Sequence, residues 1–172
     1  MRQPDSRHKQ AYLPSLLDRL IDDAPQKLSE RPDAYAPDHE GMRRIVQRDL
    51  SLLLNTINLE DEIDMSSHSA AAASVVNYGI PALTGSYLTD RNWESIEKLI
   101  RLAITRFEPR LIPESLWIRP INSNEPMRYN KLTFEIHGLM QWSPYPLEFR
   151  IQSMLDVEMN KVTLAPGAHQ QN

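Results

Sequence analysis

The spacing of the apolar residues changes once along this chain, at Pro109, and that change constrains the fold more than any other feature. Before it, apolar residues recur at helical spacing on one continuous face between residues 93 and 107. Pro109 disfavours a helical conformation at Glu108, so the helix should end near Phe107. Beyond it, apolar and polar residues alternate, which is the period of half-buried strands. Helices first and strands second predict an α+β domain, with N-terminal helices packed on a small C-terminal antiparallel sheet.

The strands are expected in a meander of about three, separated by short turns. The alternation predicts a short strand over residues 116–119 and a longer one over 131–140, with a bulge at Gly138. Residues 142–146 form a proline-rich turn before a strand over 147–152, and residues 157–164 could add a fourth strand. A small sheet of this kind has at least one free edge, which another chain can use for pairing.

Two further helices are expected in the N-terminal half. The apolar residues from Leu13 to Ile21 fall on one stripe of a helix about two turns long, with Pro14 in its first turn. A helix this short is marginal alone, so it must dock on its own domain or on a partner. Asp38 caps a second helix. Its predicted buried stripe consists of Met42, Val46, Leu50, Leu53 and Ile57, with Ile45 and Leu54 beside it.

Polar and proline-rich stretches set the predicted domain organisation. Residues 1–12 are expected to be a disordered arm, residues 13–38 a docking helix and linker, residues 39–164 the α+β domain, and residues 165–172 a disordered tail. The Ser/Ala-rich segment within residues 66–74 favours neither helix nor coil. It leads into a turn at Asn77-Tyr78-Gly79-Ile80-Pro81, where Gly79 can adopt a positive φ.

Charge and composition disfavour several classes of function. The chain has 172 residues, a formal net charge of -4 and no cysteine. Binders of nucleic acid or anionic membranes are normally basic, so we expect neither partner. No apolar run approaches the roughly 20 residues that span a bilayer, which predicts no direct membrane insertion. The polar first ten residues do not resemble a signal peptide, and the lack of cysteine fits a reducing, cytoplasmic location.

No recognised catalytic, metal or cofactor motif is present in the sequence. The five histidines show no metal-ligand spacing, and the five glycines form no phosphate-binding loop. A glycoside hydrolase needs only two carboxylates, and Glu108 and Glu135 would be the best pair. An ion pair for Glu108 and an exposed strand face for Glu135 explain them better. We therefore predict a protein that is not an enzyme and needs no metal or cofactor.

The segment Glu108-Pro109-Arg110 is the most unusual local group in the chain. A proline ends the helix there, and opposite charges flank the proline. One interpretation is a cap and ion pair that fix the corner between helix and strand. The other is a rigid charged knob that binds a neighbouring protein. An exposed ion pair would contribute only about 0 to 1 kcal/mol to stability. The spacing alone favours the first interpretation.

Four short segments follow one another in a distinctive order. They are residues 16–20 (LLDRL), 46–56 (with RDL and LLNT), 74–81 (SVVNYGIP) and 104–111 (ITRFEPRL). Together they resemble TssE, the gp25-like family of wedge subunits in type VI secretion baseplates, over about residues 13–160. The Ser/Ala segment is no hallmark of that family. Ala82 stands in the region where the family often has an acidic residue after the proline, so no charge is expected to act at this turn.

The resemblance implies a structural subunit of a contractile, phage-tail-like injection machine. Its expected partners are the wedge proteins TssF, TssG and TssK and the sheath proteins TssB and TssC, at a baseplate docked on the cytoplasmic side of the inner membrane. The terminal sheet is expected to pair with an added strand. The resemblance also assigns partner-binding residues. They are Glu108, Pro109 and Arg110, together with Leu16, Leu17, Arg19 and Leu20 on the first helix. For the Glu108-Pro109-Arg110 segment the resemblance therefore favours the charged knob over the cap and ion pair that the spacing alone favours.

Two other functions remain open at this point. The same fold serves a stress anti-adaptor that binds a response-regulator-like adaptor and blocks proteolysis. Phage relatives have also been labelled lysozyme-like, which would make Glu108 the residue to test. The turn at residues 77–81 and the Glu-Pro-Arg segment favour the baseplate subunit.

Overall fold

A computed structural model describes residues 14–21, 25–26, 36–62, 64, 67–83, 93–121, 127–128, 131–156 and 158–166. The predicted arm at 1–12, most of the linker before residue 36 and the last six residues lie outside this part of the chain. So does Asp90, which its place before the helical stripe of residues 93–107 predicts to be that helix's N-cap.

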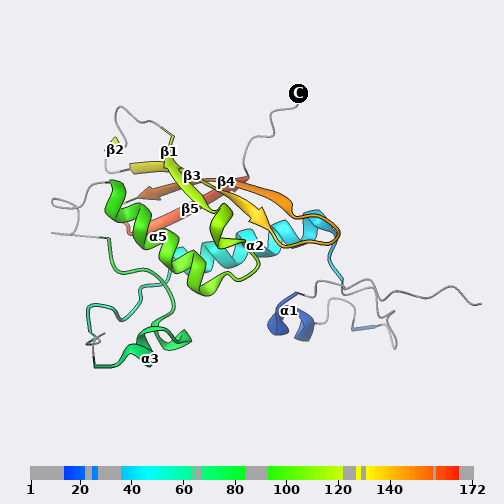
Figure 1. Cartoon of the computed structure of the whole chain (residues 1–172), viewed down its shortest axis with the longest axis horizontal. Helices are drawn as coiled ribbons and strands as arrows, with labels where there is room; N and C mark the ends of the chain where they lie inside the picture. The colour runs from blue at the N-terminus through cyan, green and yellow to red at the C-terminus, as the bar shows by residue number, and fades with distance from the viewer. Residues whose placement is uncertain are drawn as a thin grey trace, which may run out of the picture.

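The strands form one antiparallel sheet, as the alternation predicts (Figure 1). Its order is β1-β3-β4-β5, and a short β2 also pairs with β3. The strands are β1 (Trp117–Pro120), β2 (Met127–Arg128), β3 (Lys131–Met140), β4 (Leu147–Asp156) and β5 (Lys161–Pro166). The last of these passes residue 164, where the sequence analysis ends the domain, so the ordered sheet reaches further than expected.

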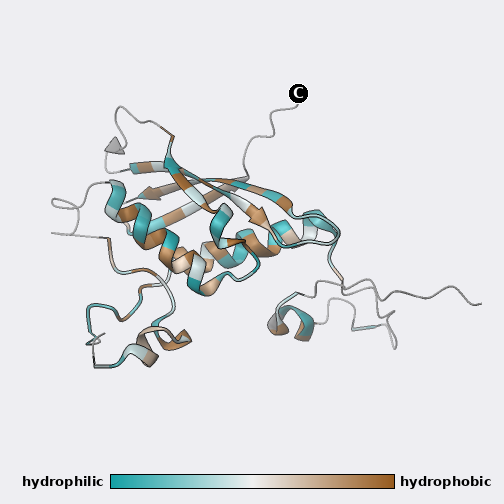
Figure 2. Cartoon of the chain, viewed as in Figure 1, coloured by the Kyte–Doolittle hydropathy of each residue, from teal (hydrophilic) through white to brown (hydrophobic). Residues whose placement is uncertain are grey.

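Two long helices pack against one face of this sheet. They are α2 (His39–Leu54) and α5 (Trp93–Phe107). The first contacts β4 and β5, and the second contacts β1 and α2. Figure 1 shows both beneath the sheet, and Figure 2 shows brown and teal segments mixed along each, as expected of amphipathic helices. This arrangement places the α+β core between the helices and the inner face of the sheet.

The core is built from the stripes that the spacing predicts. The inner face of β3 contributes Leu132, Phe134, Ile136 and Met140, and α5 contributes Ile96, Ile100, Ala103 and Ile104. Leu50, Leu53 and Leu54 of α2 are also buried there. Asp38 caps α2 by accepting a hydrogen bond from the N–H of Gly41 at 2.7 Å, as predicted.

Three details of the sequence interpretation are wrong. Ile57 does not belong to the α2 stripe, because the helix ends at Leu54 and Ile57 is 58 % exposed. Gly138 forms no bulge, since the β3–β4 register runs unbroken through the pair Gly138 and Phe149. Pro14 lies before the first helix rather than in its first turn, because Ser15 is the cap.

The remaining helical segments are short. They are α1 (Leu16–Leu20), α3 (Ser69–Ala72) and the 3-10 turns η1 (Val75–Asn77) and η2 (Pro113–Ser115). The Ser/Ala segment therefore contains one helical turn followed by η1. Figure 1 places α1 apart from the sheet, on the side of α2.

Candidate functional site

The Glu-Pro-Arg corner joins the last turn of α5 to the sheet. The N–H of Glu108 donates to the carbonyl of Ile104 at 2.8 Å, and the helix stops one residue before Pro109, as predicted. Two residues later Leu111 pairs with Met140 in an isolated antiparallel bridge. The carbonyl of Arg110 accepts from the N–H of Gln141 at 2.8 Å. The corner is therefore fixed to the helix at one end and to the end of β3 at the other.

At this corner Arg110 holds two carboxylates at once. Its Nε lies 2.6 Å from Glu108 Oε1 and its Nη2 lies 2.5 Å from Glu108 Oε2, which is a bidentate pair. The same Nη2 lies 2.6 Å from Asp49 Oδ2 on α2. Only 2 % of Glu108 is exposed, whereas Pro109 is exposed and Arg110 is partly so. The cap-and-ion-pair interpretation thus describes the geometry of the isolated chain.

The ion pairs continue from the corner to α1. Asp49 also accepts from Arg48 Nε at 2.9 Å and from Arg48 Nη2 at 2.6 Å. Arg48 in turn forms a bidentate pair with Asp18 of α1, including one contact of 3.1 Å between Nη2 and Oδ2. Acids and bases alternate along this ionic chain, whose members are Asp18, Arg48, Asp49, Arg110 and Glu108.

The turn at residues 77–81 also reaches this ionic chain. The hydroxyl of Tyr78 donates to the carbonyl of Asp49 at 3.5 Å, and its ring meets Phe107 edge-on at 5.1 Å between centroids. Burial raises the pKa of Tyr78, and the negative charges of Asp49 and Glu108 raise it further. Three segments far apart in sequence therefore meet at the end of α5.

Electrostatics keep the two arginines of the ionic chain charged. Burial alone would lower the pKa of Arg110, but the hydrogen bonds that it donates to Glu108 and then to Asp49 outweigh burial and raise the pKa. Hydrogen bonds to Asp18 and Asp49 likewise raise the pKa of Arg48. The corner thus offers neighbours fixed charges rather than a group that titrates near neutral pH.

The predicted interface residues on α1 lie on a helix whose described side chains are mostly exposed. A capping box at Ser15 and Asp18 starts the helix. Leu16 is 64 % exposed and Leu20 is 72 % exposed, and Arg19 is exposed as well. Leu17 lies in the helix, but its side chain is outside the described part of the structure. Exposed leucines four residues apart form an apolar strip that an isolated domain does not need.

Sequence reasoning missed Asp18, Asp49 and Tyr78 as members of the site. The adjacent Arg48 and Asp49 are only a weak signal in the sequence, because residues i and i+1 of a helix do not normally face each other, yet these two are bonded in the structure. The paired glutamates of the glycosidase alternative are not brought together as an acid and a base. Glu108 is bound by Arg110, and Glu135 is bound by Arg119 and Arg150 on the sheet.

The pKa of Asp18 predicts how α1 responds to acid. The hydrogen bond from Arg48, with a smaller one from Ser15, lowers the pKa of Asp18 from 3.8 to about 2. The ion pair should therefore hold α1 fully above pH 3.8 and be lost as the pH falls towards 2. Arg48→Gln is expected to return the Asp18 pKa towards 3.8, measured by NMR of the carboxyl carbon. Arg43→Gln is the matched control, and an unchanged Asp18 pKa in Arg48→Gln would contradict the contact.

Comparison with known proteins gives the class of this protein. A family model described as baseplate wedge protein gp25 matches residues 40–145, which is more than half of the chain and includes α2, the turn, α5 and the corner. The chain belongs to the gp25 family of baseplate wedge proteins, a class of structural assembly components. No curated protein and no solved structure matches the chain. No helix in the described residues is long and apolar enough to cross a membrane.

Proposed function

We propose that this protein is the TssE-type wedge subunit of a type VI secretion baseplate. In this role it binds TssF, TssG and TssK and helps to start assembly of the TssB–TssC sheath, on the cytoplasmic side of the inner membrane. The observation that carries the proposal is membership of the wedge family across residues 40–145. The ordered motifs at α1, α2, the turn and the corner support the secretion branch of that family.

The α1 helix supports a docking role in the wedge. A single bidentate ion pair, between Asp18 and Arg48, is described between this helix and α2, while Leu16 and Leu20 remain exposed. An exposed ion pair contributes about 0 to 1 kcal/mol, so the helix is weakly held by its own domain. We propose that the leucine strip packs against another wedge protein, with Leu17 and Arg19 contributing to the same contact.

The corner supports a second contact, through Pro109 and Arg110. Glu108 is too buried to touch a neighbour directly, so its part is to hold the guanidinium of Arg110 in place. Arg110 is 25 % exposed at its side chain and stands beside the exposed ring of Pro109. A charged group in a fixed position loses little side-chain entropy when it binds.

The sheet edges differ in their capacity to accept a strand from the sheath. On β5, the side-chain amide of Asn55 donates to the carbonyl of Val162 at 2.9 Å and accepts from its N–H at 2.8 Å. This contact occupies the outer edge of β5. On β1, the antiparallel register turns the N–H and C=O of Ile118 away from β3. We therefore propose β1 as the edge for strand addition.

The test is to recover the tagged full-length protein from its own cells and identify the co-purifying chains by mass. Wild type is expected to recover TssF and TssG, and Glu108→Ala with Arg110→Ala is expected to lose them. The matched control is Glu94→Ala with Lys98→Ala, which removes one acid and one base from the exposed side of α5. Circular dichroism of both purified variants must show a folded domain.

Recovery of neither wedge protein, in cells that express both, would overturn the proposed function. Recovery of a response-regulator-like adaptor instead would identify the anti-adaptor function. Equal loss of wedge proteins from the control variant would show that the corner is not the interface.

A further inference from the structure

The outer face of the sheet, which no helix of the described structure covers, carries two arginines around one buried carboxylate. Arg119 of β1 lies opposite Glu135 of β3, and Arg150 of β4 lies opposite the neighbouring His137. Arg119 Nε is 3.0 Å from Glu135 Oε2, and Arg150 Nε is 2.5 Å from Glu135 Oε1. Glu135 is only 3 % exposed, so the sequence expectation of an exposed glutamate at this position is wrong.

The carboxylate between the two guanidinium groups remains ionised. Burial would raise the pKa of Glu135, but the hydrogen bonds from Arg150 and Arg119 outweigh it and lower the pKa. One negative charge is thus shared by two positive charges, and the cluster keeps an excess of one positive charge. Both arginine side chains are also well exposed, Arg119 at 58 % and Arg150 at 41 %.

The two arginines have more hydrogen-bond donors than their contacts with Glu135 use. Arg150 contacts Glu135 through Nε, and Arg119 through Nε and Nη2. A guanidinium has five N–H donors in a planar fork that matches a carboxylate. The Nη groups of Arg150 and the Nη1 of Arg119 therefore have N–H groups that the contacts with Glu135 do not use.

An aromatic surface adjoins the arginines. The guanidinium of Arg119 lies 4.7 Å from the ring centroid of Trp117, and the same ring stacks on His137 at 4.4 Å. His137 Nε2 lies 2.9 Å from Oε1 of Glu148, an exposed carboxylate on this face whose charge also acts on Arg150. These contacts hold Arg119 in a defined position above the sheet.

The charge of this face is opposite to that of the whole chain. Among the side chains that the structure describes, strand alternation places four cations on this face against three carboxylates, in a chain whose formal net charge is -4. The cations are Lys131, Arg119, Arg150 and Lys161, and the carboxylates are Glu135, Glu148 and Asp156. This excess of positive charge favours an acidic binding partner.

We propose that the Arg119–Glu135–Arg150 cluster binds an acidic segment of a partner protein through that segment's carboxylates. Nucleic acid is a poorer fit, because proteins bind it through surfaces with a large excess of positive charge. The described side chains of this face have an excess of one positive charge. The same argument disfavours an anionic membrane. The inference does not depend on the proposed baseplate role, because it follows from the geometry of the sheet alone.

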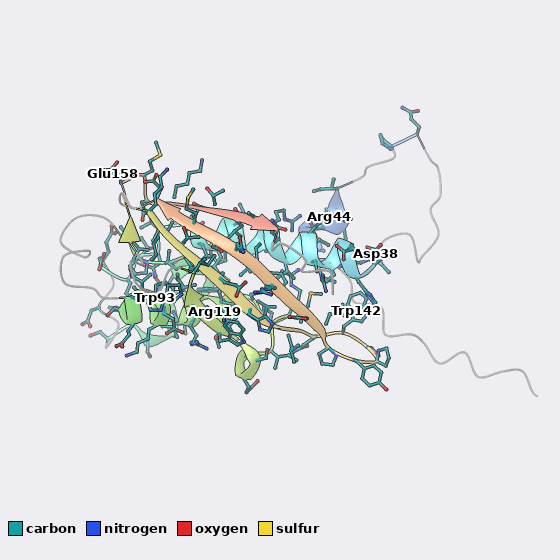
Figure 3. The ribbon with its side chains drawn as sticks, turned by 90° about the horizontal axis from the view of Figure 1, so that it is seen from above. Asp38, Arg44, Trp93, Arg119, Trp142 and Glu158 are labelled. Carbon is teal, nitrogen blue, oxygen red and sulfur yellow. The ribbon has the colours of Figure 1, made fainter. Side chains whose placement is uncertain are left out.

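The test uses acetylated, amidated hexaglutamate as the probe and the ¹⁵N-labelled full chain as the receptor. We expect the probe to shift the side-chain NMR signals of Arg119 and Arg150 and the indole signal of Trp117. Hexaglutamine should shift none of them, and added salt should weaken the effect. The side-chain NMR signal of Arg44 is the internal reference for these shifts. Figure 3 looks onto the sheet and shows Arg44 on α2, well away from Arg119.

Glu135→Gln is the most informative variant. The proposal predicts that it binds hexaglutamate more tightly, whereas a cluster that only stabilised the fold would give no such gain in affinity. Removing the internal carboxylate frees both guanidinium groups, so the affinity for hexaglutamate should rise by about threefold or more, within the range of one charge-assisted hydrogen bond. The variant with Arg119→Gln, Glu135→Gln and Arg150→Gln keeps an uncharged polar cluster and should bind about tenfold more weakly.

The control variant is Arg44→Gln with Lys98→Gln, which removes two exposed positive charges from the helices. It should leave the affinity unchanged. An equal loss in this control, or no rise in Glu135→Gln, would overturn the proposal. So would a stronger response of the same signals to oligothymidylate or to phosphatidylglycerol vesicles than to the peptide.

Discussion

Arg110→Ala is expected to lower the free energy of unfolding by about 3 kcal/mol, the low end of the cost of breaking a buried ion pair from one side. Glu108 is 2 % exposed, and Arg110 supplies both side-chain contacts to its carboxylate. Without the guanidinium, the carboxylate keeps its contact from the N–H of Arg110 at 3.2 Å, which cannot replace a charge. Asp49 loses the same partner but retains Arg48.

The double variant Glu108→Ala with Arg110→Ala should be more stable than Arg110→Ala alone. Removing both partners removes the uncompensated charge, so we expect a loss of about 1 to 2 kcal/mol for the missing contacts. If the two substitutions acted independently, their losses in the free energy of unfolding would add, whereas here the second substitution is expected to restore part of the loss. Urea denaturation of the wild type, the two single variants and the double variant measures this coupling in one double-mutant cycle. The domain is expected to stay folded, as the co-purification experiment requires.

Arg48→Ala is the control within the same ionic chain. It removes a guanidinium whose side chain is 45 % exposed and whose carboxylate partners are less buried than Glu108, so the loss should stay below about 1 kcal/mol. A loss for Arg110→Ala no larger than that for Arg48→Ala would mean that water reaches Glu108. In that case the corner would not be held by its ion pair.

The sequence predicts those parts of the fold that depend on neighbours along the chain. The stop at Phe107 follows from the conformation that Pro109 allows at Glu108, and the cap at Asp38 follows from its own side chain. The inner stripe of β3 follows from alternation. These rules need no knowledge of the tertiary structure, which is why they hold.

The parts that were missed depend on contacts between distant segments. Glu135 looks like an exposed strand residue until β1 and β4 bring Arg119 and Arg150 against it from 16 and 15 residues away. Asp49 reaches Arg110 across 61 residues. Ile57 continues the helical period, but Asn55 leaves the helix to bind Val162 of β5. Periodicity shows which residues of one helix or strand are buried, but it does not show which distant side chains they contact.

Gly79→Ala is expected to lower the free energy of unfolding by more than about 3 kcal/mol, because strained backbone and a backbone clash add. Gly79 has a φ of +120°, which residues with a side chain rarely adopt. A Cβ there would lie 2.2 Å from the carbonyl oxygen of Thr56. That oxygen accepts the N–H of Ile80 at 2.9 Å, so the chain cannot move aside without losing the contact.

The effect of Gly79→Ala should spread to the corner. Asn58 donates to the carbonyl of Ile80 at 3.0 Å, and Tyr78 packs on Phe107 next to Asp49. The variant should therefore move the NMR signals of Tyr78 and Phe107 as well as lower the urea midpoint. Gly138→Ala is the matched control, since a Cβ there meets Ser115 Oγ at 3.5 Å, an ordinary contact. It should change stability by less than about 1 kcal/mol, as glycine in a strand has no advantage over alanine. Equal losses at the two glycines would show that the turn at residues 77–81 relaxes around a side chain, and that it does not set the position of Tyr78 against the corner.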